Sequence, residues 1–241
     1  MQDNRLNKIR LNRFIALCGI CSRRKADEMI SQGLVKVNQI TINKLGFNVS
    51  WGDEVLVNGE KIQPENHQYV LLNKPKGYIT TMSDEKNRKT VISLIKPSFK
   101  ERLFPVGRLD KDTTGLLLFT NDGALAKELT HPKHEVRKTY NVSLNKSVSQ
   151  RNMEAIKNGV KLEDGLMKTD HIRYLDNSQK TVQLTIHSGK NRIIRRLFRF
   201  FNYDVKKLDR VGYSFLKKDN LRQGKWRRLT LKEVTELKKN H

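Results

Sequence analysis

The chain has 241 residues, of which 37% are hydrophobic and 30% charged, and 48 Lys and Arg against 25 Asp and Glu give a net charge of +23. This balance excludes a disordered chain, because such chains are poorer in apolar residues. No run approaches the ~20 apolar residues that span a bilayer, and the first 14 residues lack the apolar core of a signal peptide. We therefore expect a cytoplasmic protein without membrane contact.

Two short helices are predicted between residues 10 and 32. Apolar residues recur at helical spacing until Gly19 breaks the pattern: Leu11, Phe14, Ile15 and Cys18. Ser22 is typical of a helix N-cap, so a second helix is predicted over 23–30, ended by Gly33. Valines at 35 and 37 alternate with polar residues, and valines at 55 and 57 recur at the same spacing, which predicts strands. We expect residues 1–60 to form one unit, with a polar linker over 61–68.

Cys18 and Cys21 are the two cysteines of the chain. A Cys-x-x-Cys pair can be redox-active or supply half of a zinc site. A structural zinc ion needs four ligands, and no second cysteine pair or nearby histidine completes the set. We therefore predict two small residues between helices and no metal site.

Residues 69–241 are expected to form a second domain. Strands are predicted over 69–72, 116–119, 139–144, 171–175 and 181–186, and residues 73–77 are predicted to form a turn. Helices are predicted over 91–95, with Thr90 as a cap, and over 124–130, 149–158, 191–201 and 230–239. Because strands and helices do not alternate regularly, the pattern predicts an α+β fold with a largely antiparallel mixed sheet flanked by helices.

The positive charge is clustered near the end of the chain. Residues 186–228 contain 14 Lys and Arg against three Asp. A generally solvated basic surface would spread its charge more evenly, whereas a cluster is typical of a protein that meets a polyanion, most often nucleic acid.

Arg23, Arg24 and Lys25 begin the second predicted helix, where cations oppose the helix dipole. An external anion such as a phosphate explains this placement, and a solvated charge run explains it equally well.

A tight charged turn, Gly107-Arg108-Leu109-Asp110, precedes the buried strand predicted over 116–119. A carboxylate held between cations stays ionised and can act as a nucleophile. Taken alone, Arg108 and Asp110 are explained better as a structural ion pair at a turn. Asp112 is the nearest second acid, and nothing marks it as a catalytic partner.

Two further residues have a structural and a functional interpretation. Tyr140 follows Arg137 and Lys138, so it can stack on a base or simply fill the core from its strand. Arg195 belongs to a basic helix whose arginines occupy several helical phases, so one of them can face inward. A buried arginine needs an acidic partner, and Asp110 can supply it.

These motifs together resemble the RsuA-type family of bacterial ribosomal RNA pseudouridine synthases. Four stretches carry the resemblance in order: Gly107–Asp110, Lys138-Thr139-Tyr140, Gly189–Arg196 and Val205–Arg210. The first unit resembles the small alpha-L RNA-binding module of a ribosomal protein, through 10–14, 22–24 and 35–38. The stretch Thr130–Val136 looks closest to the large-subunit branch called RluB.

The resemblance implies roles for single residues. Asp110 matches the aspartate that attacks the target nucleoside, Tyr140 the tyrosine that stacks on its base, and Arg195 the cation that pairs with the aspartate. Leu208 and Arg108 are expected to line the substrate pocket. The residues expected to contact RNA are Arg10, Ser22, Arg23, Arg24, Lys25, Lys36, Lys190, Asn191, Arg192 and Arg196. Lys190 and Ile193 depart from the commoner residues of the family pattern.

The expected activity is isomerisation of a uridine to pseudouridine in large-subunit ribosomal RNA or a ribosomal precursor, by a monomer that needs no cofactor or metal. The alternatives are the same reaction on small-subunit RNA, a non-catalytic RNA-binding or ribosome-assembly protein, and a glycosidase with an aspartate nucleophile. The glycosidase alternative lacks a second acid and does not explain the basic clusters.

Overall fold

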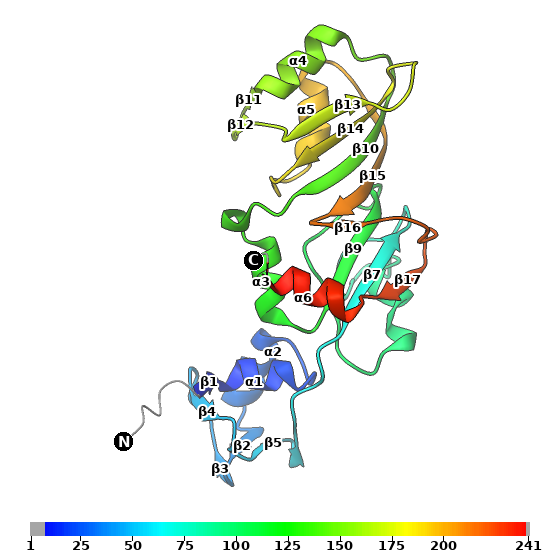
Figure 1. Cartoon of the computed structure of the whole chain (residues 1–241). Coiled ribbons are helices and arrows are strands. Elements are labelled where there is room, and N and C mark those ends of the chain that lie inside the picture. Colours follow the sequence, from blue (N-terminus) through cyan, green and yellow to red (C-terminus); the bar gives the residue numbers. More distant parts are fainter. Residues whose placement is uncertain (1–7, 240–241) are drawn as a thin grey trace. The chain divides into compact units, whose positions relative to one another are not determined.

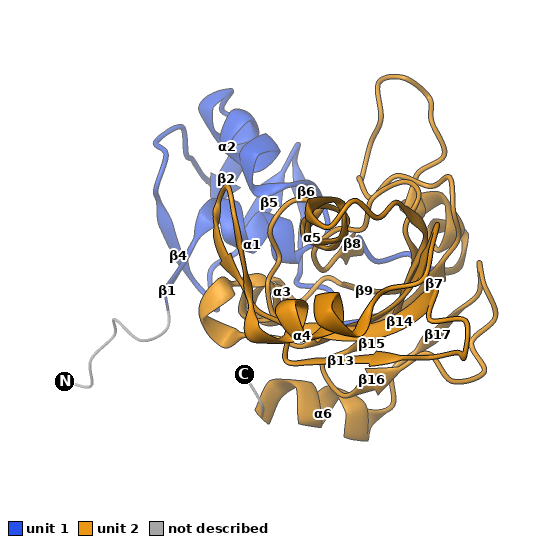
Figure 2. Ribbon diagram, turned by 90° about the horizontal axis from the view of Figure 1, so that it is seen from above, with its two compact units in different colours: residues 1–68, 99–102 blue, residues 69–98, 103–241 orange. Residues whose placement is uncertain are grey.

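The computed structural model describes residues 8–239, which divide into two compact units (Figure 2). The first unit comprises residues 8–68 and 99–102, and the second comprises 69–98 and 103–239. Residues 1–7, part of the expected first unit and of the segment without a signal-peptide core, lie outside the described residues.

The first unit packs two helices against short strands. Its elements are β1 (Lys8–Arg10), α1 (Leu11–Leu17), α2 (Arg23–Ser31), β2 (Val35–Val37), β3 (Ile40–Thr41), β4 (Asn48–Ser50), β5 (Val55–Val57) and β6 (Glu60–Lys61). Strand β1 pairs with β4, and the other strands form a sheet in the order β3-β2-β5-β6. Ser22 caps α2 as predicted, because its hydroxyl accepts a hydrogen bond from Lys25 N at 3.2 Å. Gly33 follows the helix with a φ of +71°.

Residues 61–68 lie against this first unit. Lys61 belongs to β6, and Ile62 is buried in the unit's apolar core. Glu65 N donates a hydrogen bond to Leu17 O of α1 at 2.9 Å. The segment therefore takes part in the packing of the module that precedes it.

The second unit is built on one large sheet (Figure 1). Its strands are β7 (Tyr69–Lys74), β8 (Phe104–Pro105), β9 (Thr114–Thr120), β10 (Lys138–Leu144), β13 (His171–Tyr174), β14 (Thr181–Ile186), β15 (Val205–Tyr213), β16 (Leu216–Lys217) and β17 (Trp226–Arg228). The main order is β13-β14-β10-β15-β9-β7-β17, with β16 on β15 and β8 on β9. Strands β11 (Val160–Leu162) and β12 (Gly165–Met167) form a separate hairpin.

Helices cover the two ends of this sheet (Figure 1). They are α3 (Gly123–Thr130), α4 (Gln150–Asn158), α5 (Ile193–Phe200) and α6 (Leu231–Lys239), with short 3-10 turns at η1 (Val91–Leu94), η2 (Lys96–Ser98) and η3 (Pro132–His134). Buried residues of α3 and Leu237 of α6 pack on Leu71 of β7 and on Leu116 and Leu118 of β9. The α+β class and the largely antiparallel sheet predicted from the sequence are confirmed.

Some boundaries differ from the predictions. Strand β7 continues through Lys74, where a turn was predicted, and the central strand β15 was not predicted at all. Helix α5 begins at Ile193, two residues later than predicted, because Arg192 has a left-handed backbone with a φ of +46°. Thr90 precedes the 3-10 turn η1 without a capping hydrogen bond from its side chain.

The strand pair β9 and β15 is parallel, whereas the other strand pairs within the described residues are antiparallel apart from an isolated bridge at Ile79 and Thr90. It is short, with Thr114 opposite Asp209 and Gly115 opposite Arg210. Gly115 has a φ of +105°, and a Cβ there would lie 2.8 Å from the carbonyl carbon of Arg210 and nearer still to its O and N. Glycine is therefore required for the two backbones to approach at this point.

Replacing Gly115 by Ala is expected to lower the free energy of unfolding by about 3 kcal/mol, because the methyl group overlaps the β15 backbone and the φ is strained. Urea denaturation measures this change. Gly123→Ala is the matched control, since a Cβ at Gly123 meets no atom within 4 Å. The control should change the unfolding free energy by less than about 0.5 kcal/mol, and equal effects of the two substitutions would contradict the close-approach argument.

Candidate active site

The turn that carries Asp110 lies between β8 and β9 and is held from both sides. Val106 N donates to Leu118 O at 2.7 Å, which ties the chain to β9 before Gly107 turns it with a φ of +75°. Thr80 Oγ donates to Leu109 O at 2.7 Å and accepts from Leu109 N at 3.2 Å. The turn closes with a hydrogen bond from Thr113 N to Asp110 O at 3.1 Å. Asp110 is thus presented on a fixed backbone.

Lys74, at the end of β7, holds the same turn through hydrogen bonds to its backbone. It is fully buried, and its ammonium donates to Thr113 O at 2.7 Å, Pro75 O at 3.0 Å and Lys111 O at 3.3 Å. Three backbone carbonyls therefore satisfy the three N–H bonds of one ammonium group. Burial lowers the pKa of Lys74 to about 8, against its ordinary value of 10.5, and the nearby Asp112 and Asp110 partly oppose this shift.

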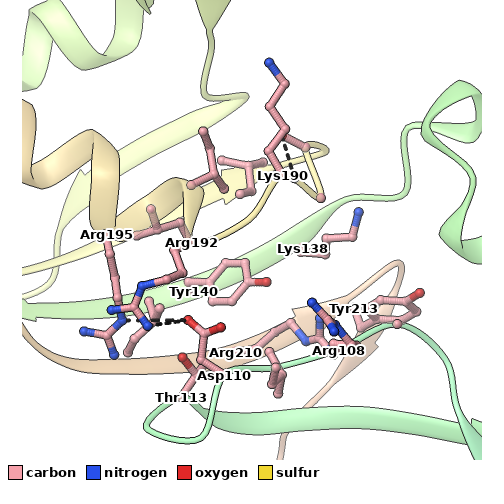
Figure 3. Close-up of a pocket in the computed structure, with 18 of the residues that line it drawn as sticks. Arg108, Asp110, Thr113, Lys138, Tyr140, Lys190, Arg192, Arg195, Arg210 and Tyr213 are labelled. Atoms are coloured by element: carbon pink, nitrogen blue, oxygen red, sulfur yellow. Dashed lines mark hydrogen bonds and ion pairs between the residues drawn. The ribbon is translucent and has the colours of Figure 1, made fainter. Parts of the chain in front are cut away.

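Two guanidinium groups approach Asp110 from the start of α5 (Figure 3). Arg192 Nη1 lies 3.4 Å from Asp110 Oδ2, and Arg195 Nε lies 4.0 Å from the same oxygen. The left-handed backbone at Arg192 allows a residue outside the helix to reach the carboxylate, and strain of this kind is common at functional sites. Arg192, expected from the sequence to contact RNA, is therefore the cation nearest to Asp110.

Arg195 is more buried than Arg192, with 15% of its side chain exposed against 48%. Its Nη1 donates to Val205 O at 3.0 Å, and burial lowers the pKa of its guanidinium, with the positive charge of Arg192 adding to the effect. The nearby carboxylate of Asp110 opposes that shift and favours the charged form. Asp110 thus stabilises the positive charge of Arg195 at a partly desolvated position.

These groups line a pocket of about 190 Å³. The sheet forms one wall with the buried Tyr140 of β10 and Leu208 of β15, and the turn and α5 form the others. Arg108 lies at the pocket with its side chain exposed to solvent. Asp110 is the one carboxylate among the lining residues, and Asp112 is exposed and outside the lining.

The other residues expected to contact RNA occupy two places. Lys190 lines the pocket, and Arg196 binds Asp164 of the β11–β12 turn, with Nη2 2.7 Å from Oδ2. Lys190 Nζ also contacts Asp164, and Asn191 is exposed outside the lining.

The rest of the set belongs to the first unit. Arg10 ends β1, and Lys36 is exposed in β2. The N-terminal part of α2 carries the others: Ser22, Arg23, Arg24 and Lys25. Lys25 pairs with Glu28 at 2.8 Å.

Sequence reasoning missed three polar groups of the site: Lys74, Lys138 and Arg210. The sequence predicts a turn at Lys74, and it marks Lys138 only as part of a motif. Arg210 lies two residues beyond Leu208 on β15, so it faces the same side of the sheet. If residues 205–213 are recognised as a strand, the two-residue spacing of Leu208 and Arg210 places both side chains on the pocket side of the sheet.

The described residues hold no group of three or more His, Cys, Asp or Glu side chains arranged to bind a metal ion. Over residues 8–239, no helix is sufficiently long and apolar to pass through a bilayer.

Comparisons with known proteins agree across the two units. The family described as "RNA pseudouridylate synthase" matches residues 68–200, and the S4 domain matches residues 9–55. The Bacillus subtilis protein named "Ribosomal large subunit pseudouridine synthase B" is 42% identical over 233 residues, covering 95% of each chain. An Aquifex aeolicus protein named "Uncharacterized RNA pseudouridine synthase" is 38% identical, covering 95% of this chain and 94% of its own. A structure described as "Crystal structure of pseudouridylate synthase" superposes with a TM-score of 0.69 at 31% identity, covering 95% of this chain and 99% of its own.

The buried Lys74 gives a pH-dependent contribution to stability. Its pKa is about 8 in the folded chain and returns to about 10.5 on unfolding, so between these values the unfolded state binds one more proton. The contribution of Lys74 to the unfolding free energy therefore rises as the pH increases from 8 to 10.5. The unfolding free energy of the wild type minus that of Lys74→Met, measured by urea denaturation, should therefore increase over this range. A constant difference would contradict the assignment.

Proposed function

The chain belongs to the RNA pseudouridylate synthase family, and we propose that it isomerises a uridine to pseudouridine in ribosomal RNA of the large subunit. The name of the Bacillus subtilis relative, which matches over nearly the whole length of both chains, supports the large-subunit substrate. The enzyme is an isomerase, since uridine and pseudouridine have the same atoms and differ in the bond that joins base to ribose.

The observation that carries the proposal is the placement of Asp110. It is the single carboxylate among the pocket residues, it faces two guanidinium groups at 3.4 and 4.0 Å, and it lies near the ring of Tyr140 (Figure 3). A carboxylate placed in a pocket beside the space for a substrate can act as a nucleophile, and the two guanidinium groups hold it by charge attraction. The absence of a second lining acid disfavours glycosidase chemistry, which uses two.

The proposed roles follow from this arrangement. The target uridine leaves its stack, at a cost of a few kcal/mol, and enters the pocket against the ring of Tyr140. Stacking on one aromatic ring stabilises the flipped base by roughly 1–3 kcal/mol. Asp110 then starts the isomerisation by attack on C1′, attack on C6 or elimination, and Arg195 and Arg192 hold its carboxylate in position. Leu208 and Arg108 line the space that the nucleotide occupies.

RNA contacts are proposed on both units. Around the pocket, Lys190, Asn191 and Arg196 are placed to meet the backbone that flanks the target, and phosphates there must replace Asp164 as the partner of Lys190 and Arg196. On the first unit, the S4 match and the exposed cations at the N-terminus of α2 support binding of RNA phosphates. The groups proposed for this are Arg10, Ser22, Arg23, Arg24, Lys25 and Lys36.

We also propose that the enzyme works as a monomer in the cytoplasm. Every residue that lines the pocket comes from one unit of one chain, so a second copy is not required to complete it. Sedimentation of the enzyme with and without RNA measures the oligomeric state directly.

Asp110→Asn should abolish the reaction and leave RNA affinity largely unchanged, because it removes the nucleophile and keeps the shape of the side chain. Release of tritium from RNA that contains 5-tritiated uridine measures the reaction, and filter binding measures affinity. Asp112→Asn, an exposed neighbour outside the pocket, is the matched control and should keep its activity.

Three outcomes contradict parts of this proposal. Activity of Asp110→Asn near the wild-type level would remove Asp110 from its role. A wild-type enzyme that binds ribosomal RNA and releases no tritium from any of it would support a non-catalytic RNA-binding protein. Pseudouridine mapping in a strain without this protein identifies the substrate, and a loss in small-subunit RNA would overturn the large-subunit assignment.

RNA affinity should fall steeply with salt, since each phosphate contact to a single strand adds about 0.7 to the slope of log affinity against log salt. Arg24→Met should reduce this slope by about 0.7. Lys61→Met is the control, because Lys61 already pairs with Glu54 at 3.1 Å within the same unit. Equal slopes for wild type and Arg24→Met would remove Arg24 from the proposed RNA contacts.

A further inference from the structure

Lys138 and Arg210 form a second group of charges in the pocket, apart from the arginines around Asp110. Arg210 of β15 is the direct cross-strand partner of Tyr140 on β10, and Lys138 precedes Tyr140 by two residues on the same face. Figure 3 shows Arg192 and Arg195 on the Asp110 side of the Tyr140 ring, whereas Lys138 and Arg210 lie towards its hydroxyl end. The pocket therefore has a carboxylate end and a cationic end with an aromatic ring between them.

Arg210 is 3% exposed and incompletely satisfied. Its Nε donates to Leu116 O of β9 at 2.7 Å, and its guanidinium lies 4.9 Å from the ring centre of Tyr213. These contacts fix its orientation. Its Nη2 is buried and has no hydrogen-bond partner among residues 8–239. A buried donor without a partner costs about 1–3 kcal/mol, so its retention calls for an acceptor that arrives from outside.

Lys138 faces the same space with its charge also uncompensated by an acid. Its ammonium donates to His187 O at 2.9 Å, and no acidic partner for Lys138 or Arg210 occurs within the described residues. Burial, together with the nearby positive charge of Arg210, lowers the pKa of Lys138 to about 8. Two buried cations with no counter-charge are unfavourable by themselves, and a negatively charged oxygen between them makes the arrangement favourable.

The position of this cationic end matches one atom of a bound uridine. The ribose C1′ must lie near Asp110, and the uracil ring extends from C1′ through N1 across the face of Tyr140. The atom opposite N1 in the ring is C4, so its carbonyl oxygen O4 points away from Asp110. We propose that Arg210, assisted by Lys138, binds O4 of the flipped uracil and stabilises the negative charge that develops on it during isomerisation. This inference rests on the proposed function and names two further catalytic residues for it.

The electron flow requires such a group. When Asp110 attacks C1′, the C1′–N1 bond breaks and its electron pair enters the uracil ring, spread over N1, O2 and O4. Bond formation from C5 to C1′ then uses a pair of the ring and returns Asp110 as a carboxylate, after which C5 loses a proton and N1 gains one. Elimination also expels the base as an anion, and attack at C6 moves the pair of the C5–C6 double bond to O4. Charge reaches O4 by each route.

The rival occupant of the cationic end is an RNA phosphate. A phosphate carries its full charge before and after reaction, so cations that bind it contribute mainly to RNA affinity. Cations that bind O4 meet a neutral carbonyl in the bound substrate and a charged oxygen during reaction, so they contribute mainly to the rate. A substitution that lowers mainly RNA affinity therefore indicates a phosphate at the cationic end, and one that lowers mainly the rate indicates O4.

The test uses single-turnover tritium release and filter binding with Arg210→Met and Lys138→Met. Each variant is expected to lower the rate by about 10²-fold, the typical loss for one donor to a developing oxyanion, with RNA affinity within about threefold of wild type. Arg173→Met is the control for loss of one positive charge, because Arg173 bonds Gln183 outside this pocket. Thermal unfolding checks each variant, and Lys138→Met, which keeps the Arg210–Leu116 bond, decides the outcome if Arg210→Met does not fold.

Altered substrates identify the atom that is bound. Sulfur in 4-thiouridine accepts weaker hydrogen bonds than oxygen, so the loss caused by either variant should shrink to less than about tenfold on this substrate. A neutral methylphosphonate 5′ to the target should leave the loss unchanged. Loss of affinity in place of rate, or a loss that shrinks with the methylphosphonate and not with sulfur, would overturn the proposal in favour of phosphate. Variants as fast as the fully active wild type would overturn it and leave the isomerase function intact, whereas an inactive wild type would reject the function itself.

Discussion

The close approach of β9 to β15 is the constraint on which the site depends. Gly115 lets the two backbones meet, and the Arg210 side chain then crosses to Leu116 O. This parallel contact joins the turn that carries Asp110 to the strand that carries Leu208 and Arg210. Without it, the carboxylate and the sheet wall of the pocket would belong to separate parts of the fold.

The electrostatics of the pocket follow from where each charge is fixed. The ammonium of Lys74 donates hydrogen bonds to three backbone carbonyls and so holds the turn that carries Asp110. Arg192 and Arg195 come from the start of α5 and act on the carboxylate itself. Of the cations at the site, Lys74 positions the turn, Arg192 and Arg195 face Asp110, and Lys138 and Arg210 lie towards the hydroxyl end of Tyr140. Arg108 and Lys190 also line the pocket.

Local signals allowed much of the fold to be predicted from sequence. Ser22 as a cap and the paired valines of the first unit predicted elements that the structure contains. Strand β15 is not predicted from the sequence because charged residues such as Lys206 and Lys207 interrupt the alternation of apolar and polar residues. Its pairing with β10 and β9 joins segments that are far apart in the chain, so local sequence does not reveal it. Tertiary contacts override local preference in such strands. Arg192 shortened α5 for a similar reason, since its left-handed backbone has no signature in the sequence.

Asp110 and Tyr140 could be singled out from their motifs, whereas the geometry of the charges around them could not. The helical phases of the basic helix and the family resemblance both suggest Arg195 as the partner of Asp110. Spacing along a helix does not reveal that Arg192, just before α5, comes nearer. Lys74 looked like a turn residue because its three partners are backbone carbonyls, which carry no sequence signal.

The strand order of the large sheet also has a consequence for biosynthesis. Strand β15 lies between β10 and β9, although it is made long after both of them. A nascent chain that ends before Val205 therefore lacks the central strand, and with it the wall formed by Leu208 and Arg210. Domains generally fold from the N-terminus as they leave the ribosome. All residues of the first unit, including residues 99–102, are synthesised before β15, so the first unit can fold during translation while the catalytic pocket is still incomplete.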